Sequence, residues 1–135
     1  MAKIGINLAT GSLQQEEIIV GIDLGTTNSL IAIIHPDTRK AVALREHDSS
    51  SIVPSVIYFD PEGNVTVGEA AKEFLITAPK RTVFSAKRLL GKNYTDIQQN
   101  ASFFPYNISD NGREQPVTVK VDDHYYSPLE LSSWY

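Results

Sequence analysis

The chain has 135 residues, of which 41% are hydrophobic and 21% charged, a composition typical of a soluble globular protein with one small core. Its net charge of −4 leaves no basic excess for binding nucleic acid or an anionic membrane. Cysteine is absent, which excludes disulfides and thiolate metal sites. No apolar run approaches the ~20 residues of a membrane helix, and no apolar signal-peptide core follows Lys3. We therefore expect a cytoplasmic protein without nucleic-acid or membrane partners.

Residues 1–17 differ in pattern from the rest of the chain. Apolar side chains alternate with small or polar ones between Ile4 and Leu8, which is a weak strand signal. The following residues, up to Glu17, are mostly polar and predict a flexible lead-in without recognisable chemistry. We interpret residues 1–17 as an N-terminal extension of a domain that begins near Ile18.

The stretch from residue 18 to 34 predicts two buried strands around a polar turn. Residues 18–22 and 30–34 are short apolar runs rich in β-branched side chains, which favours strand over helix. In the turn between them, Leu24 is the only large apolar side chain.

The residue types of this turn suit phosphate binding. Gly25 lacks a Cβ, so its backbone can adopt positive φ and come close to a ligand, and consecutive N–H groups in such a turn form an anion-binding nest. Thr26, Thr27 and Ser29 add hydroxyl donors. A carboxylate beside a phosphate requires a cation between them, so Asp23 predicts Mg²⁺ held through its water molecules. The same residue types also fit an ordinary hairpin with a polar turn.

The rest of the chain predicts short strands and helices in succession. The strand patterns are at residues 41–44, 52–59, 65–67 and 117–121, and a polar turn at 122–124 leads into a return strand at 125–126. The helix patterns are at residues 69–76, at 83–90 with Thr82 as its cap and Gly91 as its end, and at 96–100.

A last helix begins at Ser127. Serine at the N-cap, Pro128 at the first helical position and Glu130 at the third form a capping-box signal. Only the residues up to Tyr135 follow, and a helix of about two turns needs packing to be stable. We therefore expect the chain to be the N-terminal piece of a longer protein.

The letters GIDLGTTNS at residues 21–29 resemble the first phosphate loop of the DnaK-type heat-shock chaperones, the heat shock protein 70 family. Four further segments match this family in order: VPSV at 53–56, VGEAA at 67–71, AKRLLG at 86–91 and YSPLELS at 126–132. The resemblance implies an α/β protein, here an α+β fragment, with the actin-like (ribonuclease H-like) ATPase fold. Residues 18–135 would be the N-terminal part of its nucleotide-binding domain, in lobe I, with hairpin sheets and flanking helices.

The resemblance also implies which residues carry the chemistry. Gly25, Thr26, Thr27 and Asn28 would hold the phosphates of ATP or ADP, and Asp23 would bind a water of the Mg²⁺ shell, with K⁺ as a further candidate ion.

Lys87 would act on the terminal phosphate during hydrolysis, although its residue type alone predicts an ordinary exposed lysine. Arg88, beside it, would form a structural salt bridge between subdomains.

An ATP-hydrolysing chaperone of this family would work with a J-domain co-chaperone, a nucleotide exchange factor and client peptides. The letters DIQQ at residues 96–99 and PY at 105–106 resemble HscA, the chaperone of iron–sulfur cluster assembly, whose client is an iron–sulfur scaffold protein. Two other functions remain open at this point: a sugar or acetate kinase of the actin-like superfamily, and a non-catalytic interaction module.

Other polar or aromatic groups predict no site. His35, His47 and His124 share no metal-ligand spacing. The sequence Asp-Asp-His at residues 122–124 reads as a solvated turn. The run FFPY at 103–106 has no basic neighbours in sequence and predicts a packing cluster rather than a stacking platform.

Overall fold

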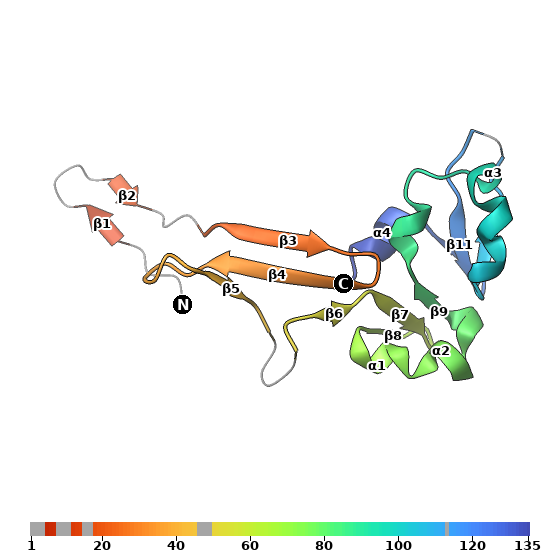
Figure 1. Cartoon of the computed structure of the whole chain (residues 1–135), viewed down its shortest axis with the longest axis horizontal. Coiled ribbons are helices and arrows are strands. Elements are labelled where there is room, and N and C mark those ends of the chain that lie inside the picture. The colour runs from red at the N-terminus through yellow and green to blue at the C-terminus, as the bar shows by residue number, and fades with distance from the viewer. Residues whose placement is uncertain (1–4, 8–11, 15–17, 46–49, 113) are drawn as a thin grey trace.

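The computed structural model describes residues 5–7, 12–14, 18–45, 50–112 and 114–135. Within these residues the strands form four sheets, joined by turns and short helices (Figure 1). The mixed strand and helix content agrees with the predicted α+β class.

The N-terminal extension contains a small hairpin. Strand β1 (Gly5–Asn7) pairs antiparallel with β2 (Ser12–Gln14), with Ile6 opposite Leu13. The prediction of a lead-in without regular structure was therefore wrong for residues 12–14, because their backbone pairs with β1. Ile4 and Leu8, which belonged to the predicted alternating pattern, lie outside the described residues, as does His47.

The predicted first hairpin is confirmed. Strands β3 (Val20–Leu24) and β4 (Asn28–Ile34) pair antiparallel from Val20 opposite Ile33 to Leu24 opposite Ser29. The edge strand β5 (Ala41–Ala43) pairs with the far end of β4, and β6 (Val53–Pro54) pairs with its beginning.

The prediction that these strands are buried was wrong. Ile22 is 68% exposed and Val20 and Ile31 are also exposed, and in β4 only Ser29 is buried. Both faces of the hairpin carry apolar side chains, which is the pattern of a sheet covered on both sides. Within the described residues, the hairpin extends away from the compact part of the molecule (Figure 1), so its side chains remain in contact with solvent.

A second sheet has the order β8-β7-β9. It consists of β7 (Val56–Phe59), β8 (Val65–Val67) and β9 (Thr82–Phe84), all antiparallel. The single strand predicted over residues 52–59 is in fact divided at Ser55, because β6 pairs with β4 whereas β7 pairs with β8 and β9. Ser55 therefore joins two different sheets.

The helix predicted at residues 69–76 is interrupted. Helix α1 (Glu69–Lys72) and helix α2 (Phe74–Thr77) are separated by Glu73, and the short 3-10 helix η1 (Pro79–Arg81) follows.

The helix predicted at residues 83–90 was wrong in its first half. Residues 82–84 form β9, and only the 3-10 helix η2 (Ala86–Leu89) is helical. Thr82 does not cap a following helix, because its hydroxyl donates instead to the carbonyls of Phe74 and Ala78, at 3.1 and 2.8 Å. Pairing with β7 thus overrides the helical pattern of this segment.

The C-terminal third adds a sheet of β10 (Asn107–Ser109), β11 (Thr118–Val121) and β12 (His124–Tyr126). The alternation predicted for β11 is confirmed, since Val119 and Val121 are buried. Helix α3 (Tyr94–Ile97) and the 3-10 helix η3 (Gln98–Phe103) cover the region expected at 96–100. Helix α4 (Pro128–Ser132) begins as predicted, with the Ser127 hydroxyl accepting a hydrogen bond from the Glu130 N–H at 3.1 Å.

The core lies between the second and third sheets. Its buried members come from the β7 to α4 part of the chain: Ile57, Phe59, Val83, Ala86, Leu89, Ile97, Tyr106, Val117, Val119, Val121 and Leu131.

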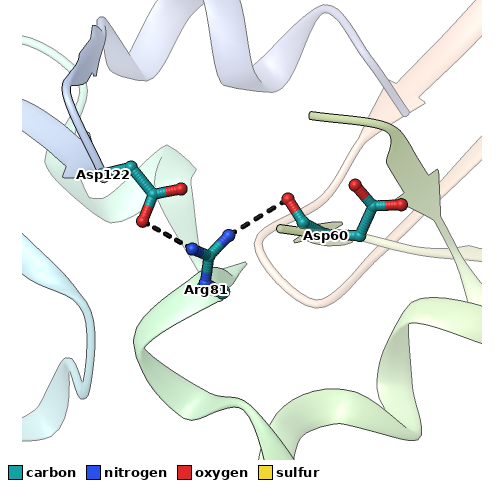
Figure 2. Close-up of polar contacts among 3 residues, drawn as sticks. All are labelled: Asp60, Arg81 and Asp122. Carbon is teal, nitrogen blue, oxygen red and sulfur yellow. Dashed lines mark hydrogen bonds and ion pairs between the residues drawn. The ribbon is translucent and has the colours of Figure 1, made fainter. Parts of the chain in front are cut away.

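Arg81 joins the turns of the two sheets at the surface (Figure 2). Its guanidinium donates to the Asp60 carbonyl at 3.0 Å and pairs with the Asp122 carboxylate at 2.7 Å.

Candidate phosphate-binding site

The turn between β3 and β4 consists of Gly25, Thr26 and Thr27, because β3 ends at Leu24 and β4 begins at Asn28. Gly25 is required here for a steric reason. A Cβ at this position would collide with the carbonyl oxygen of Asn28 across the turn. Gly25 is not among the glycines with positive φ, so the predicted left-handed conformation was wrong. Glycine is therefore needed to close the turn.

Ser55 holds the turn in place through hydrogen bonds to its carbonyl groups. Its backbone N–H donates to the Thr27 carbonyl at 2.8 Å, and its hydroxyl donates to the Gly25 carbonyl at 3.0 Å. The Ser29 hydroxyl lies 3.0 Å from the Ser55 hydroxyl, and both serines are buried. Buried hydroxyls that are fully hydrogen-bonded hold a backbone in one conformation, since breaking any of these bonds leaves a buried polar group unsatisfied.

Lys87 reaches the same turn from η2. Its ammonium group donates a hydrogen bond to the carbonyl oxygen of Leu24, which is 63 residues away in sequence. Ala86 and Leu89 anchor η2 in the core, while the Lys87 side chain stays exposed. The structure therefore places Lys87 at the base of the turn.

The end of β9 is also fixed, and this sets the position of η2. The Tyr106 hydroxyl donates to the Phe84 carbonyl at 2.7 Å. Burial raises the pKa of Tyr106, so the hydroxyl keeps its proton and remains a donor. Ser85 then adopts left-handed φ of 54°, a conformation that is uncommon for a residue with a side chain and that clusters at functional sites. The chain thus changes direction two residues before Lys87.

These contacts occupy hydrogen-bond acceptors of the turn but not its N–H donors. The carbonyls of Leu24, Gly25 and Thr27 accept hydrogen bonds from Lys87 and Ser55. In the described part of the chain, the backbone N–H groups of Thr26 and Thr27 form no backbone hydrogen bond outside the strand ladders. A turn whose carbonyls are occupied and whose N–H groups are free can bind an anion such as phosphate.

Asp23 lies in β3 opposite Leu30, with an exposed side chain. Among the described residues it forms no ion pair, and no group of three or more potential metal ligands is present. One carboxylate and several hydroxyls are hard oxygen ligands, which suit Mg²⁺ bound mainly through water. These oxygen ligands suit a Mg²⁺ ion that is bound through its water molecules better than one that is coordinated entirely by protein groups.

The turn forms one end of a groove of about 700 Å³. Thr26, Thr27 and Asn28 line it, together with Ser55. Asp23, Gly25 and Lys87 are not among its lining residues. The structure therefore brings the predicted site residues to one turn, but it distributes them between the groove and the base of the turn.

Sequence reasoning missed Ser55 as a site residue. It was quoted only within the matched VPSV segment, and a serine between apolar residues gives no local sign of its partners. Two of the other polar candidates have local partners among the described residues. His35 accepts a hydrogen bond from the Asp37 N–H at 3.3 Å within its turn, and Asp122 pairs with Arg81.

The hairpin sheet, the antiparallel sheets that follow it and the short helices agree with the actin-like ATPase fold. The sequence model of the family described as Hsp70 protein matches residues 19–135. The chain therefore belongs to the Hsp70 family of chaperones, whose members bind and hydrolyse ATP. No helix among the described residues has the length and apolar character needed to cross a membrane.

Proposed function

We propose that this chain supplies the first phosphate loop and the hydrolytic lysine of an ATP-driven chaperone. The observation that carries the proposal is the bonding pattern of the turn. Lys87 and Ser55 occupy its carbonyls and leave the N–H groups of Thr26 and Thr27 available. An ordinary polar hairpin does not need a lysine 63 residues away at its base.

Each predicted residue has a separate role in this proposal. The backbone of Gly25, Thr26, Thr27 and Asn28 binds the β- and γ-phosphates of ATP, with a threonine hydroxyl as a further donor. Asp23 orients a water of the Mg²⁺ shell, and the ion itself neutralises phosphate charge when bound.

Lys87 carries the catalytic part of the proposal. An ammonium group has three N–H donors, and Leu24 uses one of them. The remaining donors can stabilise the charge that develops on the transferring phosphoryl group and help to orient the attacking water. The bond to Leu24 limits the movement of the side chain, so that little reorganisation is needed during the reaction.

The cellular role follows from the family and the matched segments. Residues 18–135 form the N-terminal part of the nucleotide-binding domain, and residues 1–17 precede it as an extension. ATP hydrolysis drives binding and release of client peptides in the cytoplasm, with a J-domain co-chaperone and a nucleotide exchange factor as partners. The segment at 96–99 favours an HscA-like chaperone, whose client is an iron–sulfur scaffold protein.

The replacement Lys87→Ala in the complete protein tests the catalytic role. We expect single-turnover hydrolysis of ATP to fall by roughly 10²-fold, the effect of losing one preorganised donor, while the affinity for ATP changes much less. Rapid-quench kinetics and titration calorimetry measure the two quantities separately. Lys40, an exposed lysine in the β4–β5 turn, provides the matched control Lys40→Ala. Equal losses in affinity and rate would instead make Lys87 a ground-state phosphate ligand.

A further inference from the structure

A second groove lies next to the groove at the phosphate turn. Its volume is about 670 Å³, within the range of ligand sites in proteins. The two grooves share Phe84, Ser85 and Phe103 among their lining residues. The second groove is bounded by η2 on one side and by the α3–η3 segment on the other.

The charged residues that line this groove, two cations and one carboxylate, give it a net positive charge. Arg88 and Lys92 line it, and neither side chain forms an ion pair or a hydrogen bond with another described residue. Among the described residues, Asp96 is the one acidic residue that lines the groove. One oxygen of that carboxylate accepts a hydrogen bond from the Asn93 N–H at 2.9 Å and completes the capping box of α3, whose N-cap is Asn93.

The other wall of the groove is aromatic. Phe103 is 74% exposed, although it belongs to the run predicted to be a packing cluster. Tyr106 in that run is buried and Phe104 packs against the core, so the prediction holds for them and was wrong for Phe103. An exposed phenylalanine beside unpaired cations has the composition of a binding hot spot.

We propose that this groove binds an acidic peptide segment of a partner protein, with an apolar side chain on Phe103 and carboxylates on Arg88 and Lys92. Charge complementarity selects carboxylates over basic groups, and a guanidinium binds a carboxylate with two parallel hydrogen bonds. The two grooves share the wall at Ser85. The charged and the aromatic walls of the second groove offer an extended peptide two different kinds of contact. The binding itself does not depend on the proposed ATPase chemistry.

Titration calorimetry of the 135-residue chain with a short peptide tests the proposal. The probe is the blocked pentapeptide Glu-Asp-Phe-Glu-Asp. The control peptides replace its phenylalanine with glycine or its acidic residues with lysine. We expect the acidic phenylalanine peptide to bind, with an affinity that falls when NaCl is raised from about 0.15 M to about 0.5 M. The glycine peptide should bind at least about tenfold more weakly, and the lysine peptide should not bind.

Matched variants locate the binding. We expect Lys92→Glu and Phe103→Ala each to weaken binding of the acidic peptide by about tenfold or more. Lys40→Glu and Leu129→Ala are the controls, because Lys40 is exposed in the β4–β5 turn and Leu129 is 72% exposed on α4. These controls should bind the peptide like the unmodified chain. Circular dichroism verifies that all four variants are folded.

Three results would overturn the proposal. One is unchanged affinity in both Lys92→Glu and Phe103→Ala. Another is equal weakening by the control variants, which would show that the peptide is not bound specifically in this groove. The third is equal binding of the lysine peptide, which would remove charge complementarity as the basis of recognition.

Discussion

At the scale of single residues, Ser55 donates two hydrogen bonds to carbonyls of the proposed phosphate turn. It holds the turn through its backbone N–H and its hydroxyl, and it lies where the chain passes from one sheet to another. Its side chain is 1% exposed, so each hydrogen bond forms away from competing water. This position makes Ser55 a positioning residue for the turn, whereas Lys87 is proposed to act on the phosphate itself.

The replacement Ser55→Ala should weaken ATP binding by about tenfold, because the Gly25 carbonyl and the Ser29 hydroxyl both lose a partner and the turn gains freedom. Titration calorimetry with Mg·ATP measures this loss in the complete protein. Ser132→Ala is the matched control, since that buried hydroxyl donates to the Pro128 carbonyl at 2.7 Å, far from the turn in sequence. If both variants lose similar thermal stability and similar ATP affinity, Ser55 has only a structural role.

The replacement Gly25→Ala should affect folding as well as binding. A Cβ collides with the Asn28 carbonyl inside the turn, so the hairpin must open to accommodate it. We expect a lower melting temperature and weaker ATP binding together, in contrast to the more selective loss in Ser55→Ala. Thermal unfolding and calorimetry on the same samples measure both effects. A variant with an unchanged melting temperature and unchanged affinity would contradict the tight closure of this turn.

At the scale of elements, β9 and η2 bring Lys87 to the turn. β9 is fixed by pairing with β7 and by the Tyr106 hydroxyl, and Ser85 redirects the chain into η2. Arg81 precedes β9 directly and joins it to the turns at Asp60 and Asp122 (Figure 2). This clamp connects the second and third sheets at a partly exposed position.

The Arg81–Asp122 pair should contribute modestly to stability. The side chains are 28% and 50% exposed, and pairs in such positions typically contribute about 0.2–1 kcal/mol. A double-mutant cycle with Arg81→Gln and Asp122→Asn, followed in urea by Trp134 fluorescence, measures the coupling. The more exposed pair Lys72–Glu69 provides the comparison and should couple more weakly. A coupling energy near zero that does not change with salt would show that the Asp60 carbonyl is the partner of Arg81 that matters.

At the scale of the whole molecule, the described residues divide into a compact part with a core and a hairpin sheet that lacks one. The core residues all lie at or after Ile57, while Ile22 and Ile31 remain exposed. The phosphate turn lies at the end of the hairpin sheet, where Ser55 and Lys87 connect it to the compact part. Charge stabilisation of a reacting phosphate requires a site that excludes water, and this turn faces an open groove.

We therefore expect the 135-residue chain by itself to fold at least in its compact part, but neither to bind ATP tightly nor to hydrolyse it. One turn, one carboxylate and one lysine leave the nucleoside and much of the phosphate surface in water. Titration calorimetry with Mg·ATP and a phosphate-release assay measure these two properties. A micromolar Kd, or hydrolysis that Lys87→Ala abolishes, would show that these residues form a complete site.

The sequence by itself determined the features that depend on neighbouring residues. The presence of two strands around a polar turn at β3 and β4, the alternation in β11 and the Ser127 cap of α4 all follow from local patterns. The tertiary structure alone decided the division at Ser55, the strand at 82–84 and the exposure of the first hairpin. It also decided the contact between Lys87 and Leu24. Each of these depends on partners distant in the chain, and residue periodicity contains no information about which distant segment supplies a hydrogen bond or covers an apolar face.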